Sequence, residues 1–208
     1  MTRAFTKCHF FSATMANSLI GIQFRAQLEN VTGLRPQDDE FKWHLKLKCV
    51  SCKHVPDHWQ YVTQTPSLAL RGNLECATPP RRRANSVIKC KMCKMERSID
   101  VVGESVTSYD AGDSGSFKTI VVFNCHGMEP VDFSPGKDWT CFGFKPASAD
   151  DKGRKGCTFN HIDLCEGDGD FVDYDSVIRE SIMVSEIEYQ IIRIKRNQKT
   201  LKTCYLNN

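Results

Sequence analysis

The sequence predicts an all-β protein built from two related, packed β units. Two stretches carry most of the evidence, because apolar and polar residues alternate along 20–28 and along 41–49, as in strands with one buried face. The turn between them, GLRPQDDE, is rich in residues that interrupt strands. No segment shows the longer apolar repeat of an amphipathic helix.

The remaining elements follow in chain order. The stretch 136–156 reads as a loop, because Gly, Pro, Asp and Lys follow one another closely, and EGDGDFVDYD at 166–175 reads as an acidic loop. A closing strand is predicted at 182–191, where the apolar alternation changes phase and indicates a bulge. Shorter strands are expected at 58–62, 86–89, 98–102 and 118–124.

An internal similarity indicates the two related units. Phe41-Lys42 lies eight residues before Cys49, and Phe117-Lys118 lies eight residues before Cys125. The predicted units span residues 18–108 and 109–192, and a chance match between short strand patterns is the alternative.

Length and charge predict one module with an extension at each end. The 208 residues are 40% hydrophobic, enough to bury a core, and we assign 18–192 to the folded module. Residues 1–17 are expected to be a disordered N-terminal extension, with Met15 as the natural start or with a weak mitochondrial transit signal as the alternative. Residues 193–208 are expected to be a basic tail. A net charge of +3 requires neither a nucleic-acid nor a membrane partner, and the arginines at 81–83 are read as a solvated loop.

Cysteine usage indicates a reducing compartment. The chain has 11 cysteines, an odd number, and its first residues lack the apolar core of a secretory signal. We therefore expect free or metal-bound thiols in the cytoplasm, with the nucleus as a second compartment.

Four of the cysteines form two C-x-x-C pairs. Cys49 and Cys52 follow one predicted strand, and Cys90 and Cys93 follow another. Two such pairs can place four thiolates around one zinc ion, so these four cysteines are the predicted zinc ligands in a ribbon-like site of the first unit. An iron site of the same geometry, or two unrelated pairs of free thiols, are the alternatives. The second unit reads Cys125-His126-Gly127-Met128 at the corresponding place and has lost the pattern.

Residues 20–62 resemble the start of the eukaryotic CXXC-motif-containing zinc-binding proteins. The resemblance rests on LENVTGLRP, on FKWHLKLKC and on the first knuckle followed by Trp59-Gln60-Tyr61, and it continues through VIKCKMCKMERSIDVV and FKTIVVFNCHGMEPVDFSP. It covers about residues 18–192 and implies a small monomeric β protein with zinc on the two C-x-x-C pairs and no established enzymatic activity. The segment ECATPPRRRAN, the N-terminal extension and the basic tail depart from the family pattern, and none of them affects the zinc ligands.

These features predict a non-enzymatic zinc-binding protein, acting as an adaptor or in metal homeostasis. Four protein ligands close the zinc shell, whereas a catalytic zinc keeps a position open. We expect an unknown protein partner, a monomer, no membrane and no nucleic acid. One alternative is a nucleic-acid-binding zinc ribbon, with Lys42, Lys46 and Lys48 as a basic face. The other is a thiol redox enzyme whose reactive cysteine is Cys76, Cys125, Cys141, Cys157 or Cys165.

Overall fold

The computed structural model describes residues 17–65, 85–147, 153–165 and 170–195. The expectations for the N-terminal extension before residue 17, for Arg81–Arg83, for Cys76 and for the tail beyond residue 195 lie outside these ranges. Within them the regular structure is mainly β-strand, as predicted, and only two short 3-10 turns, Gly103–Ser105 and Ala111–Asp113, are helical. Neither turn is long or apolar enough to cross a membrane.

The described strands form three antiparallel sheets. The largest has six strands in the order β11-β12-β1-β7-β6-β5, and two three-stranded sheets have the orders β10-β9-β2 and β4-β3-β8. The strands are β1 (Asn17–Glu29), β2 (Val31–Pro36), β3 (Trp43–Cys49), β4 (Gln60–Val62), β5 (Ser86–Lys89), β6 (Glu96–Val101), β7 (Lys118–His126), β8 (Met128–Ser134), β9 (Trp139–Lys145), β10 (Arg154–Ile162), β11 (Phe171–Asp175) and β12 (Glu180–Ile194).

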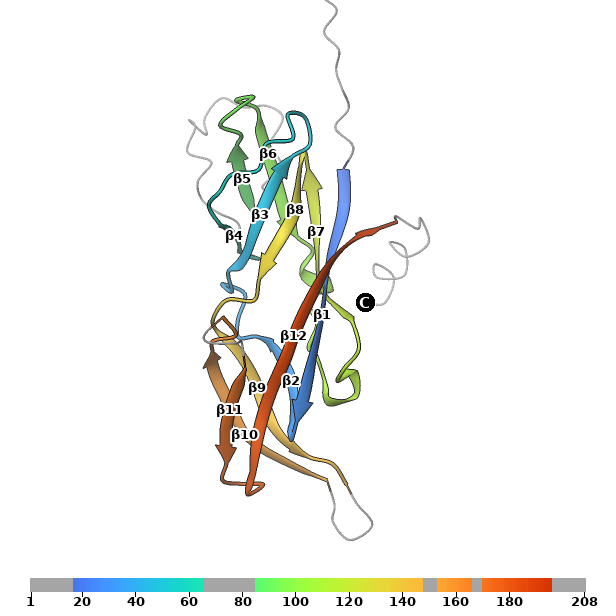
Figure 1. Ribbon diagram of the computed structural model, residues 1–208, viewed down its shortest axis with the longest axis vertical. Helices are drawn as coiled ribbons and strands as arrows, with labels where there is room; N and C mark the ends of the chain where they lie inside the picture. Colours follow the sequence, from blue (N-terminus) through green and yellow to red (C-terminus); the bar gives the residue numbers. More distant parts are fainter. Residues whose placement is uncertain (1–16, 66–84, 148–152, 166–169, 196–208) are drawn as a thin grey trace, which may run out of the picture.

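The two longest strands, β1 and β12, form the spine of the molecule (Figure 1). They pair antiparallel along most of their length, with β3 to β8 gathered around one end and β2, β9, β10 and β11 around the other. β1 lies between β7 and β12, β2 pairs with β9, and β3 pairs with β8. Strands from both halves of the chain therefore share every sheet, and the relatedness of the two predicted units stays a prediction.

The phase change predicted in the closing strand is a β-bulge. Arg25 pairs with Glu188 and Gln27 pairs with Ser185, so β12 uses one more residue than β1 over this step. Glu186 sits in the extra position with a φ of 50°, in the left-handed region.

Two predicted loops were wrong in part. Strand β9 and the start of β10 occupy much of 136–156, and β11 occupies the end of the expected acidic loop. Strand β10 carries few apolar residues and lies at a sheet edge, so alternation could not reveal it. Gly156 in β10 and Gly143 in β9 do not mark turns. They leave room for the Asp175 carboxylate, which lies close to both.

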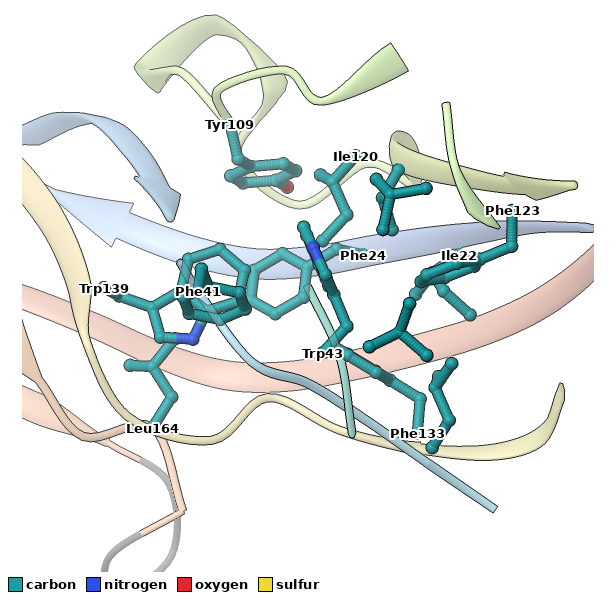
Figure 2. Close-up of a cluster of buried hydrophobic side chains, with 14 of the residues drawn as sticks. Ile22, Phe24, Phe41, Trp43, Tyr109, Ile120, Phe123, Phe133, Trp139 and Leu164 are labelled. Carbon is teal, nitrogen blue, oxygen red and sulfur yellow. The ribbon is translucent and has the colours of Figure 1, made fainter. Parts of the chain in front are cut away.

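Aromatic side chains from distant strands meet in one core (Figure 2). The rings of Phe24 and Trp139 stack with centroids 5.7 Å apart, and Trp43 lies 6.2 Å from Trp139 in an edge-to-face arrangement. Tyr109 packs edge-on against Phe24, and its hydroxyl donates to the carbonyl of Ala26. This core packs the β1–β12 pair against the other two sheets. It also holds the start of β3, the strand that leads to the first C-x-x-C pair.

Candidate metal centre

The first C-x-x-C pair forms a tight knuckle at the end of β3. The Lys53 N–H donates to the carbonyl of Cys49 at 2.9 Å, and the Cys49 N–H donates to the carbonyl of His54, also at 2.9 Å. Lys53 has a φ of 62°, a left-handed conformation that reverses the chain immediately after Cys52. Leu45, Leu47 and Cys49 point inward along β3, so the strand delivers the Cys49 thiol from a buried position.

The second pair repeats the same knuckle between β5 and β6. The Lys94 N–H donates to the carbonyl of Cys90 at 2.9 Å, the Cys90 N–H donates to the carbonyl of Met95 at 3.0 Å, and Lys94 has a φ of 60°. The two loops share their hydrogen bonds and their left-handed residue although they belong to different sheets. The C-x-x-C-Lys pattern thus produces the same local structure twice.

The two knuckles face each other and bring the four predicted cysteines together. All four Sγ atoms lie within 4.8 Å of one another. The Cys49 and Cys93 sulfurs are 3.7 Å apart, and the Cys52 and Cys90 sulfurs are 3.5 Å apart. Four sulfurs in a regular tetrahedron around zinc, at the usual Zn–S distance, would be about 3.8 Å apart. The donor type and the spacing therefore fit a tetrahedral zinc ion.

The protein environment divides the four thiols into more and less acidic groups. Burial opposes ionisation of Cys49, yet the N–H groups of Cys52 and Ser51, with the Cys52 thiol and the Arg97 guanidinium, lower its pKa to about 6. Hydrogen bonding to the N–H of His54 favours the Cys52 thiolate, but partial desolvation and the neighbouring thiols raise its pKa to about 11. Without a cation, four sulfurs this close cannot all be thiolates. A bound dication removes this conflict because it favours the thiolate form of every ligand.

A buried arginine supports the sulfur cluster. Arg97 is 3% exposed, its Nη2 donates to Ser51 Oγ at 2.7 Å inside the first knuckle, and its guanidinium reaches Cys49. The positive charge offsets part of the excess negative charge of four thiolates around a dication. In the sequence, only its position could have drawn attention to Arg97, because it lies on the same inward-facing side of β6 as Ile99 and Val101.

The other candidate thiols lie apart from this cluster. Cys125 and Cys141 are fully buried, and burial raises the pKa of each to about 12. His126 faces the opposite side of β7 from Cys125, with Nε2 3.8 Å from the Asp100 carboxylate. Cys157 is half-buried, and Cys165 is exposed with its sulfur 3.0 Å from Ser134 Oγ. The two most buried of these thiols are thus poor nucleophiles at neutral pH.

The fold and the cluster define a class of protein, a small antiparallel β protein with a closed four-cysteine metal centre. The chain belongs to the eukaryotic family of CXXC motif containing zinc binding proteins, whose family model matches residues 21–192. Zinc is accordingly the metal that both the family and the cluster support.

The chain is similar to proteins from several organisms. The chain is 41% identical over 172 residues to a CXXC motif containing zinc binding protein of Xenopus laevis, covering 83% of this chain and 96% of the relative. It is 38% identical over 174 residues to the Homo sapiens protein of the same name, covering 84% and 98%. A solved structure described as the crystal structure of C1orf123 matches with a TM-score of 0.69 at 37% identity, covering 85% of this chain and 99% of that one. A hypothetical protein from Plasmodium falciparum matches in fold alone, with a TM-score of 0.65 at 22% identity.

Proposed function

We propose that Cys49, Cys52, Cys90 and Cys93 bind one zinc ion as thiolates, and that the zinc is structural in a non-enzymatic, monomeric adaptor of the cytoplasm. The observation that carries the proposal is the four-sulfur cluster formed by two matching knuckles. The eight cysteines of the described residues are all free thiols, which supports a reducing compartment.

The position of the cluster supports a structural role. Cys49 ends β3 in a three-stranded sheet, whereas Cys90 and Cys93 lie between two strands of the six-stranded sheet. An ion held by all four would therefore join two sheets that are connected in sequence through the long segment between β4 and β5. A complete protein shell leaves no position for a reactive water, which argues against hydrolytic zinc chemistry.

The surface around the second knuckle supports the adaptor role. Met92 is 65% exposed and Met95 is 50% exposed, and Val87 on the edge strand β5 is also exposed. Exposed methionines form adaptable apolar contacts with protein partners.

A role in metal homeostasis is the second candidate, and a specific observation favours it. Cys52 is exposed and Cys93 is half-buried, so these two residues lie on the solvent side of the cluster. A zinc ion held in this way could be passed to another thiolate ligand without unfolding of the protein.

Metal content and metal exchange test these proposals together. Native mass spectrometry of protein purified without added metal should give one zinc per chain, and Cys90→Ser should lose the zinc and lower the melting temperature. Isotopically labelled zinc then separates the two roles. Exchange over many hours supports a structural ion, and exchange within minutes at neutral pH supports metal transfer. A Cys90→Ser protein with unchanged zinc content and stability would refute the assigned ligand set.

A further inference from the structure

The outward side of the β4-β3-β8 sheet carries an unusual combination of side chains. Strand β3 turns Leu45 and Leu47 into the core, and this places His44 and Lys46 on the outer side. His44 pairs with Tyr61 across β3 and β4, and their rings lie 6.4 Å apart. We call the outward set Lys42, His44, Lys46, Trp59 and Tyr61 the aromatic–lysine face.

Two aromatic rings on this face are open to solvent. Trp59 is 42% exposed and Tyr61 is 58% exposed, whereas the other tryptophans of the chain, Trp43 and Trp139, are 1% and 0% exposed. Side chains two residues apart on an extended segment share one side and lie about 6.6 Å from each other. The chain thus presents two neighbouring aromatic rings that take no part in the core.

Lysines lie over both rings. Lys46 Nζ is 4.7 Å from the centre of the Trp59 ring, and Lys42 Nζ is 5.5 Å from the centre of the Tyr61 ring. Lys46 also forms an ion pair with Asp132 on β8 at 3.2 Å. Burial, with help from Lys42, lowers the pKa of His44, and the lysines supply positive charge on the face. A cavity of about 360 Å³ adjoins the ring of Tyr61, and Glu40, Lys42, Thr63 and Asn85 are among the residues that line it.

We propose that the aromatic–lysine face binds single-stranded nucleic acid, with bases stacked on Trp59 and Tyr61 and backbone phosphates on Lys42 and Lys46. Single strands are bound without sequence preference by this combination, because every base has a flat face and every nucleotide carries a phosphate. An acidic peptide would contact the lysines alone, whereas a single strand would contact the lysines and also stack on the exposed parts of the two rings. The cavity beside Tyr61 gives room for a base next to the ring.

The sequence predicted the lysines of this face but not its aromatic residues. Alternation placed Lys42, Lys46 and Lys48 on one side of a strand, but nothing in the sequence joined Trp59 and Tyr61 to that side. The pairing of β3 with β4 makes the connection. The face is independent of the zinc ligands, so the binding activity and the zinc proposal can fail separately.

Tryptophan fluorescence tests the proposal directly, because Trp59 is the exposed tryptophan. The zinc-loaded protein is titrated with a 12-nucleotide oligo-uridine or oligo-thymidine in 50 mM salt, and stacking on Trp59 should quench the emission. Fluorescence anisotropy of the labelled oligonucleotide gives the affinity. The double variant Trp59→Ala/Tyr61→Ala should bind at least about thirtyfold more weakly, since each stacked base contributes on the order of 1–3 kcal/mol. Tyr174→Ala is the matched control, because Tyr174 is also 58% exposed but lies on β11 away from the face, and it should bind like the wild type.

Salt dependence tests the lysines. Neutralising two phosphates of a single strand should weaken binding about sevenfold between 50 mM and 200 mM salt, and Lys42→Ala/Lys46→Ala should remove most of this dependence. Zinc content and circular dichroism confirm that each variant is folded. The proposal is overturned if no oligonucleotide binds at 50 mM salt, or if the ring variant and the Tyr174 control bind alike. It is also overturned if a polyglutamate peptide displaces the oligonucleotide and binds more tightly, which would assign the face to an acidic protein partner.

Discussion

Asp175 is a fully buried carboxylate enclosed by backbone. Its Oδ2 accepts a hydrogen bond from the Cys157 N–H at 2.6 Å, and its Oδ1 accepts from the Val177 N–H at 2.8 Å. A Cβ atom at Gly143 would lie 1.8 Å from Oδ2, and one at Gly156 would lie 1.9 Å from it. The two glycines are therefore required by the space that the carboxylate occupies, and Asp175 joins β11 to β9 and β10.

We expect Gly143→Ala to destabilise the protein by at least about 2 kcal/mol, because the new methyl group must displace the buried carboxylate from its hydrogen bonds. Gly112→Ala is the control, since a Cβ there meets nothing within 4 Å. Urea unfolding measures both variants. Equal stability of the two would contradict the role of Asp175.

The buried Asp175 carboxylate should make the stability of the protein depend on pH in the acidic range. Burial raises the pKa of Asp175, but hydrogen bonds from the N–H groups of Cys157, Ile178 and Val177 outweigh it and lower the pKa below the usual value. A pKa that is lower in the folded state stabilises the protein above the unfolded value of about 3.9, and this contribution is lost as the pH falls through the folded value. The free energy of unfolding of wild type should therefore fall more steeply below about pH 5 than that of Asp175→Asn. Parallel curves for the two proteins would show that Asp175 is not the group responsible.

We expect Arg97 to contribute more to zinc affinity than to the stability of the surrounding fold. Replacing it with methionine keeps much of the buried volume but removes the positive charge beside four thiolates, so zinc affinity should fall by about tenfold to a hundredfold. Competition with a chromogenic chelator measures the change. Lys48→Met, a half-buried lysine at the end of β3, is the control and should change the affinity much less. An unchanged affinity for Arg97→Met would limit the arginine to packing.

At the scale of elements, sequence patterns succeeded where the local signal was strong. The strands β1 and β3 bury one side only, and their alternation was readable. The four cysteines were predictable because a C-x-x-C knuckle is a local structure that the spacing determines. Strand β10 was missed because its pairing with β9 and the carboxylate of Asp175 define it, and both come from residues distant in sequence. Arg97 and the aromatic–lysine face were missed for the same reason.

At the scale of the molecule, the two ends of the spine are expected to respond differently to loss of zinc. The cluster joins β3 to the β5–β6 hairpin at one end, whereas β9, β10 and β11 at the other end are held by the aromatic core and by Asp175. Chelation should therefore increase hydrogen exchange in residues 86–101 by more than tenfold while residues 139–145 change little. Exchange that rises equally in both regions would show that the molecule unfolds as one cooperative unit without zinc.

At the bulge in β12, the number of residues affects the packing of the strand more than the type of residue does. Before the bulge the core receives the even-numbered Ile182 and Val184, and after it the odd-numbered Ile187 and Ile191 pack against the core. Deleting Glu186 would remove the bulge and leave a regular strand with both isoleucines still inward, whereas inserting one residue beside the exposed Glu186 would turn them outward and Glu188 and Gln190 inward. Many residues could replace Glu186, glycine and asparagine best of all. Across related sequences we would therefore look for this number of residues or one fewer at this point, but not one more, with little preference for which residue fills the bulge.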